Sequence, residues 1–371
     1  MSAAAGGVVV EGARLEDLPA IEPAWRELAG RAEPNPFGDF DFVVPALRWL
    51  APRRRPFALL VWSDAAKTTL LGALVLSASP PPFGLAKIWR HELAALPAVL
   101  VASDRAAAII AGLLGWLRAH TLASGLAITE VEQSGSLFRA LKDYATQSGA
   151  ALVLERAYQR AALEIASGAD FEASLDPKRR KKWGRQRRAL ARAGPLAFAA
   201  GADAASIEAF LALETAGWKG ARGTALAATA KTASFAREML LRFAPRGCLR
   251  IDRLNLAGAP IAAGVILVAG QRGFYWKTAY DERQAAFSPG VQLALDQSRA
   301  LQAEGALELV DSCAGPDHPM IGRLWSGRLE FVDCVIAIPR RPRAAFRAAV
   351  AARRLYRGAR ERAKSLLRRS E

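Results

Sequence analysis

The chain has 371 residues, 52% of them hydrophobic and 23% charged, which is enough length for two domains and enough apolar material for packed cores. No run of about 18 apolar residues is free of charges, and the first ten residues lack a basic n-region, so we expect neither a transmembrane helix nor a signal peptide. Three widely spaced cysteines and three histidines argue against a disulfide framework and a metal site, and the cysteine pattern indicates a reducing, cytoplasmic compartment. The net charge of +16 indicates contacts with anions.

The first half is predicted to open with a short strand at Val8–Val10, followed by two helices that Pro34-Asn35-Pro36 separates. Three β runs follow, and Ser79-Pro80-Pro81-Pro82 marks a loop before the third of them. The expected ranges are 18–29 for the first helix, about 39 for the start of the second, 57–62, 69–77 and 85–89 for the β runs, 104–120 for a helix, 126–131 for a strand, 136–148 for a helix, and 151–158 with 161–165 for a strand pair.

The second half is predicted to begin near Asp170. Asp176-Pro177 is typical of a helix start, because Asp caps free backbone N–H groups and Pro lacks one at the first helical position. Ala257-Gly258 and Gln271-Arg272-Gly273 are predicted turns between three strands. The expected ranges are 177–193 for the first helix, 196–200 for a strand, 204–217 and 234–244 for helices, 248–256, 260–269 and 274–280 for strands, 290–304 for a helix, 307–311 for a strand, 319–325 for a short helix and 328–336 for a strand.

Both halves show the same order of elements: a strand, two helices, three meandering strands, a helix, a strand, a helix and a strand. No obvious sequence repeat accompanies this order. We therefore predict an α/β fold with mixed α+β sheets, built as two tandem domains of one type over residues 1–168 and 169–338. Residues 339–371 are predicted to form a basic amphipathic helix.

Three parts of the second half resemble the CelD/BioF-like acetyltransferase family, whose fold is of the GNAT type. They are Leu213–Lys219, which ends in Trp218-Lys219, then Leu256–Ala263, and then Tyr275–Glu282 with Phe287–Gly290 and Asp311. The specific match spans about residues 170–312, and the first half is similar only loosely. The resemblance implies two GNAT-like halves, as in the Fem-type transferases, and transfer of an acyl group to an amine. Several such proteins act in exopolysaccharide or envelope pathways, which suggests an amine-bearing glycan or envelope precursor as acceptor.

The expected donor site is Ser288-Pro289-Gly290-Val291-Gln292, between the last meander strand and a helix. Glycine permits close backbone approach, and the start of a helix presents unpaired N–H groups that suit a diphosphate, such as that of acetyl-CoA or another acyl-CoA. An ordinary strand–helix turn is the alternative, and the loop departs from the usual GNAT glycine spacing by having one glycine.

The GNAT arrangement implies that the strand before this loop splays from its neighbour and pairs with the pantetheine arm of the donor. Tyr275, Trp276 and Lys277 are therefore expected to bind the cofactor. Strict alternation places Trp276 on one face of the strand, and Tyr275 and Lys277 on the other. An aromatic-rich strand also fits an ordinary core position.

Acyl transfer from a thioester to an amine needs a base for the amine and a proton for the leaving thiolate. Asp311, at the end of a strand beside the expected site, and His318, in Pro316-Asp317-His318-Pro319, are the candidate bases, and Tyr280 is the candidate acid. The alternative for His318 is a loop residue that fixes a tight turn. Cys313 is expected to be a small buried cysteine and not a nucleophile.

Three further residues, Trp218, Lys219 and Asp281, are expected to bind the substrate. Trp218 and Lys219 follow from the family resemblance. Asp281, with Glu282, follows the aromatic strand directly, and these two acidic residues also fit a simple cap of a turn.

Two segments carry the positive charge. Residues 178–192 hold nine Lys/Arg and no acid, and residues 340–371 hold twelve Lys/Arg and two Glu, which leaves the rest of the chain slightly acidic. The first segment fits an anion-binding helix for phosphates of the donor, the acceptor or an aminoacyl-tRNA. It equally fits a solvated helix whose Trp183, Leu190 and Ala191 face inward.

The second segment, over residues 340–369, has apolar residues on one side of a helical wheel and arginines on the other, with Phe346 and Val350 outside the apolar stripe. It is predicted to lie on an anionic membrane surface or to pack on the body as a solvated helix. The apolar stripe consists of Ala348, Ala352, Leu355, Tyr356, Ala359, Ala363, Leu366 and Leu367.

The sequence therefore predicts an acyl-CoA-dependent N-acyltransferase, with acetyl-CoA as the expected donor, acting on an amino sugar or a lipid-linked glycan precursor at the inner face of the membrane. One alternative is a Fem-type transferase that uses aminoacyl-tRNA on a peptidoglycan precursor. Another is a binding or regulatory protein that kept the fold. Nucleic-acid binding outside the tRNA alternative is not expected, because the basic segments lack interleaved aromatic residues.

Overall fold

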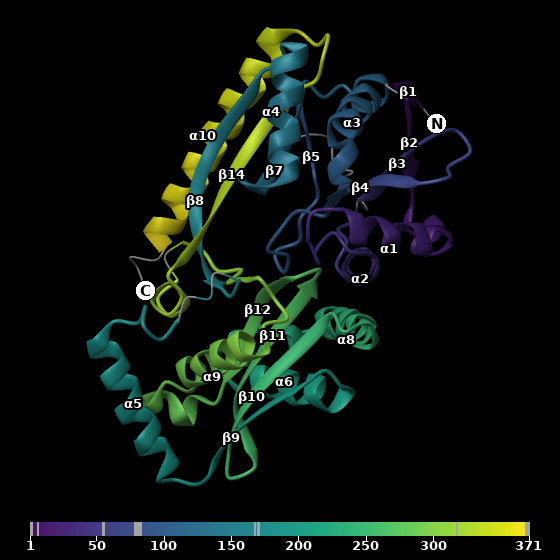
Figure 1. Cartoon of the computed structure of the whole chain (residues 1–371). Helices are drawn as coiled ribbons and strands as arrows, with labels where there is room; N and C mark the ends of the chain where they lie inside the picture. The colour runs from purple at the N-terminus through teal and green to yellow at the C-terminus, as the bar shows by residue number, and fades with distance from the viewer. Residues whose placement is uncertain are drawn as a thin grey trace. The chain divides into compact units, whose positions relative to one another are not determined.

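The computed structural model describes residues 3–5, 7–53, 56–77, 84–166, 168, 171–316 and 318–367, and it divides into two compact units (Figure 1). Unit 1 consists of residues 1–43, 51–158 and 330–371, and unit 2 of residues 44–50 and 159–329. Ser79-Pro80-Pro81-Pro82 and Asp317, which the sequence places in loops, lie outside the described residues, as do the last residues of the predicted C-terminal helix.

These units differ from the predicted domain ranges. Strand β14 (Gly327–Ala337), expected to complete the second domain, pairs antiparallel with β7 (Gly125–Glu132), and its residues from Glu330 onward group with unit 1. Strand β8 (Leu152–Glu164) is one continuous strand where two were predicted, and it contributes residues to both units. Strand pairing thus groups residues that lie far apart in the sequence.

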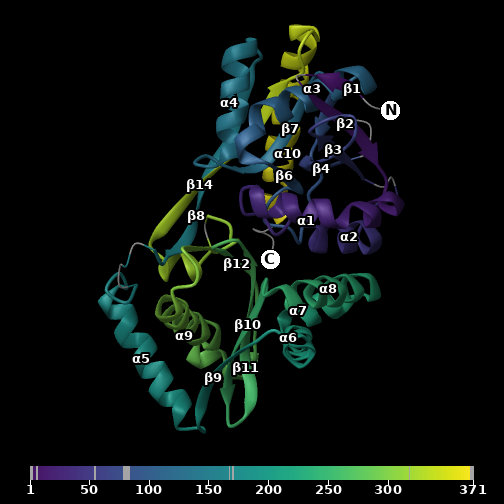
Figure 2. The same cartoon turned by 45° about the vertical axis from the view of Figure 1, so that its right-hand side comes forward.

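The N-terminal sheet of unit 1 has the strand order β1-β2-β3-β4-β6, with helix α3 (Ala106–His120) on one face and α1 (Glu22–Arg31) toward the other (Figures 1 and 2). Helix α2 (Phe40–Trp49) contributes residues to both units. The strands are β1 (Ala3–Ala5), β2 (Val8–Ala13), β3 (Phe57–Trp62), β4 (Leu70–Leu76) and β6 (Val99–Val101). The third meander strand is β6, which was not predicted. The run expected in that place, β5 (Leu85–Lys87), instead pairs in parallel with β7.

Helix α10 (Arg343–Leu367) packs on the second group of strands in unit 1, β5-β7-β14-β8, while α4 (Ser136–Ser148) follows β7. Phe346, Ala349 and Val350 are buried in a cluster with Val335 and other residues of this sheet. Arg353 donates to Glu155 at 2.9 Å. The predicted apolar stripe therefore faces away from unit 1, and Phe346 and Val350, which lie outside that stripe, make the packing.

The outward face of α10 is confirmed by the exposure of its two largest stripe residues, since Leu355 is 76% and Tyr356 55% exposed. None of the helices in the described part of the chain is long and apolar enough to cross a bilayer.

Unit 2 contains the strand order β8-β13-β12-β11-β10-β9, with α9 on one face and α6 and α8 on the other (Figures 1 and 2). The strands are β9 (Leu196–Gly201), β10 (Leu249–Leu256), β11 (Ala259–Ala269), β12 (Arg272–Tyr280) and β13 (Leu309–Asp311). The helices are α5 (Pro177–Ala191), α6 (Ala204–Ala216), α7 (Trp218–Ala221), α8 (Ala230–Phe243) and α9 (Pro289–Glu304). The element order of the first half is repeated here, so the predicted mixed α/β fold with two similar halves is confirmed.

Local sequence explains the tight connections in unit 2. Ala257 and Gly258 both have positive φ, at 49° and 84°, which suits the two-residue turn between β10 and β11. The next turn is formed by Gly270-Gln271, because Arg272 already pairs with Ala269. This turn begins one residue earlier than predicted, since Gly270 adopts a φ of 54° that glycine accommodates without strain.

Candidate functional site

Unit 2 contains a cavity of about 630 Å³ whose walls come from five segments. These are the start of α7, the end of β12, the loop into α9, the segment that follows β13, and residues 318–321. Eleven of the predicted site residues line it: Trp218, Lys219, Tyr275, Trp276, Lys277, Tyr280, Ser288, Pro289, Gly290, Val291 and His318. Asp281, Gln292 and Asp311 do not line it. Cys313 and Met320, which were not assigned to the site, do.

Strand β12 separates from β13 beside this cavity. The parallel ladder between them joins Arg272 to Leu309, Gly273 to Val310 and Phe274 to Asp311, and it ends there, although β12 continues to Tyr280. The residues of β12 beyond Phe274 and the segment after Asp311 both line the cavity. Strand β13 itself ends at Asp311, and beyond that residue no ladder joins β12 to the segment that follows.

A β-bulge lies in β12 at the same point. Val265 of β11 pairs with Lys277 and Ile266 pairs with Tyr275, so Trp276 is the extra residue. The bulge resets the alternation of side chains. Tyr275, Trp276 and Lys277 consequently all line the cavity, and the strict alternation predicted for this strand is wrong.

The loop before α9 turns sharply at Ser288, whose φ of 54° and ψ of 56° place it in the left-handed region. The Ser288 carbonyl accepts the N–H groups of Val291 at 2.9 Å and Gln292 at 3.1 Å. Because Pro289 has no N–H, Gly290 supplies the remaining backbone donor of this first turn. The helix start therefore offers an anion one free amide and the positive end of the helix dipole, fewer donors than the sequence suggested.

Hydrogen bonds join helix α5 to this loop and to α9. Gln186 Nε2 donates to the Ala286 carbonyl at 2.9 Å and to Ser288 Oγ at 3.1 Å. The buried Gln292 donates through Nε2 to the Trp183 carbonyl at 3.0 Å. Gln292 thus holds the two helices together, and it is not among the residues that line the cavity. Asp176 caps α5 as predicted, by accepting the Arg179 N–H at 2.9 Å.

Asp311 lies behind the cavity wall. It is fully buried and pairs with the buried Arg160, with 3.2 Å between Oδ2 and Nη1. Its other oxygen accepts the Cys313 N–H at 2.8 Å, at a residue whose φ is 53°. Both oxygens are thereby engaged in fixing the segment that leaves β13. This arrangement favours a positioning role over the predicted general base.

His318 lies at the cavity with its Nδ1 turned to the backbone. Nδ1 accepts the N–H groups of Met320 and Ile321, each at 3.4 Å. Burial lowers the pKa of His318 below its usual 6.5. The neutral ring then carries its proton on Nε2, so it can donate a hydrogen bond at neutral pH but offers no free lone pair for a general base.

Lys219 has a fixed position at the cavity. Its Nζ donates to Glu214 Oε1 at 3.0 Å and to the Thr278 carbonyl at 2.8 Å. Glu214 is buried and also accepts the Leu226 N–H at 2.8 Å. Lys219 therefore ties α7 to the divergent part of β12, and the neighbouring Trp218 is 43% exposed at the rim.

Asp281 serves as the cap of a short 3₁₀ turn, the alternative that the sequence left open. It accepts the Arg283 N–H at 3.0 Å and pairs with the Arg283 guanidinium at 2.8 Å. These interactions hold the pKa of Asp281 below its usual value. The carboxylate is directed to its own turn, and a substrate contact for it has no support in this geometry.

Two other titratable groups at the cavity are held protonated by burial. Burial raises the pKa of Tyr275 well above that of an ordinary tyrosine. Burial and the adjacent Asp311 raise the pKa of the Cys313 thiol. Cys313 is therefore a poor nucleophile, as expected. Within the described ranges, no cluster of His, Cys, Asp and Glu has the arrangement of a metal site.

Sequence reasoning missed Arg160, Gln186 and Glu214. Arg160 is a single charged residue next to the apolar run 161–163 of β8, and such a charge inside a buried strand signals a buried partner. Gln186 and Glu214 are ordinary residues of helical segments. Their roles depend on contacts with residues far along the chain, which no local pattern reveals.

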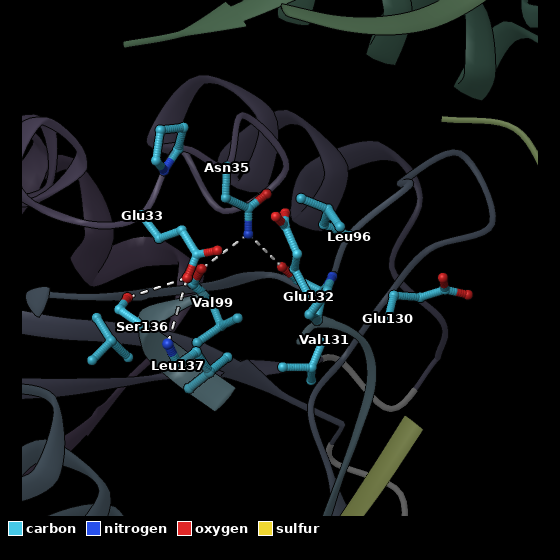
Figure 3. Close-up of a pocket in the computed structure, with 12 residues that line it drawn as sticks. Glu33, Asn35, Leu96, Val99, Glu130, Val131, Glu132, Ser136 and Leu137 are labelled. Carbon is cyan, nitrogen blue, oxygen red and sulfur yellow. Dashed lines mark hydrogen bonds between the residues drawn. The ribbon is translucent and has the colours of Figure 1, made fainter. Parts of the chain in front are cut away.

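Unit 1 has a much smaller pocket in the corresponding place, between β6 and the end of β7, of about 50 Å³ (Figure 3). The Glu33 carboxylate points to the start of α4, where it accepts the Ser136 hydroxyl at 3.1 Å and the Leu137 N–H at 3.4 Å. Asn35 donates to the Pro97 and Val99 carbonyls at 2.9 and 3.0 Å. The pocket is thus narrow, and its wall contains three carboxylates, those of Glu33, Glu130 and Glu132.

A protein-family model matches most of the part of the chain that forms this site. Residues 177–318 match the family model described as "Acetyltransferase (GNAT) domain". This range includes α5, the divergent strand, the loop into α9 and His318. No curated protein sequence matches the chain.

Solved structures show a similar fold at low sequence identity. FemX is 12% identical with a TM-score of 0.53, over 85% of this chain and 96% of that one. The C-terminal domain of a putative lysylphosphatidylglycerol synthetase from Agrobacterium fabrum is 10% identical with a TM-score of 0.52, over 90% and 96% of the two chains. A tandem GNAT protein from the clavulanic acid biosynthesis pathway is 16% identical with a TM-score of 0.45, over 90% of this chain and 100% of that one.

Proposed function

We propose that this chain, whose residues 177–318 match the GNAT acetyltransferase domain model, is an acyl-CoA-dependent N-acyltransferase that reacts in the cavity of unit 2. The observation that carries the proposal is the divergence of β12 from β13 at Phe274 and Asp311. An extended pantetheine chain suits such an opening, because it can pair with a strand edge through its amides. The cavity of about 630 Å³ also falls in the size range of small-molecule sites, about 300–1,000 Å³.

Bound acyl-CoA would supply a thioester whose acyl carbon reacts with an amine. The Gly290 N–H and the α9 dipole would hold a phosphate of the donor at the cavity rim. The Lys277 ammonium would disfavour protonation of a nearby acceptor amine, because like charges repel, and so keep that amine nucleophilic. Tyr280 lines the cavity and is our candidate to give its proton to the thiolate.

The proposed acceptor is an amino sugar or a lipid-linked glycan precursor carrying an amine. The half-exposed indole of Trp218 at the cavity rim offers a flat apolar surface suited to a sugar ring. The outward apolar stripe of α10 supports reaction at the inner face of a membrane, where such precursors are held.

Transfer from aminoacyl-tRNA is the second candidate, because FemX shares the fold and α5 carries exposed cations close to the site. A non-catalytic role would be favoured by side chains filling the groove, and the open volume of the cavity weighs against it. The two enzymatic candidates differ in their donor, which is the property to measure.

The test is calorimetric titration of the full chain with acetyl-CoA. A Cβ added at Gly290 would lie 3.7 Å from Tyr280 and 3.8 Å from the Met320 sulfur, which is ordinary contact, so Gly290→Ala should bind like the wild type. Gly290→Trp would extend from a buried position into the cavity and should abolish micromolar binding, and circular dichroism checks that this variant is folded. Absence of binding to acetyl-CoA and to longer acyl-CoAs in the wild type would overturn the proposal.

A further inference from the structure

Helix α5 carries more positive charge than its own contacts balance. Residues 178–192 hold nine Lys/Arg, eight of them in α5 and the ninth, Arg192, at its C-cap. Only Arg187 among them has an ion-pair partner within the described residues, namely Asp296 at 2.8 Å. Eight like charges on one short helix repel each other, with a cost of a few tenths of a kcal/mol for each close pair. Such a helix is suited to an anion supplied from outside the chain.

The position of α5 brings this charge to the rim of the cavity. Gln186 bonds to Ser288, which lines the cavity, and Gln292 bonds to the Trp183 carbonyl. Trp183 and Leu190 are buried and fix the helix against unit 2, whereas Ala191, predicted to face inward, is exposed. The charged helix therefore lies directly beside the start of α9.

Helical geometry selects the cations on the side of Gln186. At about 100° per residue, Lys178, Lys182 and Arg185 lie on the flank of Gln186 away from Arg187. All three are exposed. Arg180 and Arg188, also exposed, lie on the other side of the helix.

The N–H groups at the start of α9 are too few to bind all the phosphates of a nucleotide donor, because the Ser288 carbonyl already accepts two of them. The nucleotide end of CoA carries a diphosphate and a separate 3′-phosphate. We propose that Lys182 and Arg185, with Lys178, bind the 3′-phosphate while the diphosphate lies at Gly290. This inference rests on the proposed function and names the part of the donor that α5 recognises.

A nucleotide phosphate fits α5 better than an RNA chain. Proteins that hold single-stranded RNA combine cations with aromatic residues on which bases stack. The single aromatic residue of α5, Trp183, is buried beneath the helix. The exposed face thus offers charge without a stacking surface.

The experiment compares acetyl-CoA with its 3′-dephospho form by calorimetry on the full chain. Loss of charge-assisted hydrogen bonds should weaken binding of the dephospho form by at least about tenfold in the wild type. The double variant Lys182→Ala/Arg185→Ala should bind the two ligands equally. The matched control Arg180→Ala/Arg188→Ala removes the same charge from the other side and should keep the tenfold preference.

Equal binding of both ligands by the wild type would overturn this inference while leaving the proposed function intact. An equal loss of preference in the control variant would also overturn it, because net charge and not position would then matter. Failure of the proposed function has a different result, since neither ligand would bind. A further outcome is that the wild type binds deacylated tRNA tightly but binds neither acetyl-CoA nor its dephospho form, and that the Lys182→Ala/Arg185→Ala variant loses the tRNA binding. This outcome would overturn both the inference and the proposed function, and it would favour the tRNA donor.

Discussion

Asp311 and Arg160 support the site although neither residue lines the cavity. In the sequence, a carboxylate at the end of a strand beside the expected site is a candidate general base. In the structure, the two oxygens of Asp311 are occupied by Arg160 and by the Cys313 N–H. The second contact fixes the left-handed turn at Cys313, where the chain leaves the line of β13. We infer that this ion pair maintains the divergence on which the cavity depends.

Replacement of Asp311 by Asn should therefore reduce stability together with activity. Removing one partner of a buried ion pair weakens the compensation of the other charge, which costs up to about 3–5 kcal/mol. Urea unfolding measures this loss. The double variant Asp311→Leu/Arg160→Met should recover most of the free energy of unfolding, because it removes both charges. Glu208→Gln is the control, since its pair with Arg237 is exposed and should contribute less than about 1 kcal/mol.

A result in which Asp311→Asn keeps its full free energy of unfolding but loses turnover would contradict the positioning role. It would return Asp311 to the chemistry as a base. Partial loss of both quantities, restored together in the double variant, would support the role described above.

At the scale of elements, the C-terminal helix shows what a helical wheel can and cannot predict. The wheel separates the two faces of α10 correctly but does not say which face packs. Val350 and Phe346 pack inward because the neighbouring strands present Leu85 and Val335, which lie far away in the sequence. The wider apolar stripe, with Leu355, is left exposed.

This exposed stripe should bind anionic membranes. Exposed Arg347 and Arg354 flank Leu355 and Tyr356, so an anionic bilayer would satisfy both the charges and the apolar side chains. We expect co-sedimentation with phosphatidylglycerol vesicles and little with phosphatidylcholine. Leu355→Glu/Tyr356→Glu should weaken it by about tenfold, in line with the free energy of burying a large apolar side chain. Leu241→Glu, at a 49% exposed position of α8, should leave binding unchanged, and an equal effect there would refute a specific surface.

Local sequence signals predict the helices and strands of the second half more accurately than they predict the register of the strands. Asp176-Pro177 and Ala257-Gly258 act through nearby backbone groups, and the helix start and turn they predict are present. The bulge at Trp276 depends on its pairing with β11, and the short β6 depends on pairing with β4, so no local pattern predicts either. The candidate site is accordingly located by its motifs, whereas the roles of Gln292 and Asp311 follow from contacts across the fold.

At the scale of the whole molecule, two halves with the same element order have unequal sites. In unit 2 the strands diverge at a cavity of about 630 Å³, beside exposed cations on α5. In unit 1 the corresponding pocket is about 50 Å³, and the Glu33 carboxylate already occupies the start of α4 (Figure 3). Glu132 adds negative charge that repels phosphate, whereas Glu130 pairs with Arg90 at 3.9 Å.

We therefore expect each chain to bind one molecule of acyl-CoA, although it has two halves of one type. Calorimetry with acetyl-CoA should give a stoichiometry near one, and Gly290→Trp should remove all of the binding. Glu33→Gln, which leaves unit 2 untouched, should change neither the stoichiometry nor the affinity. A stoichiometry near two, with one site surviving in Gly290→Trp, would mean that unit 1 opens to a donor despite its carboxylates. The repeated fold would then provide two active sites, whereas the charges and volumes described here favour one.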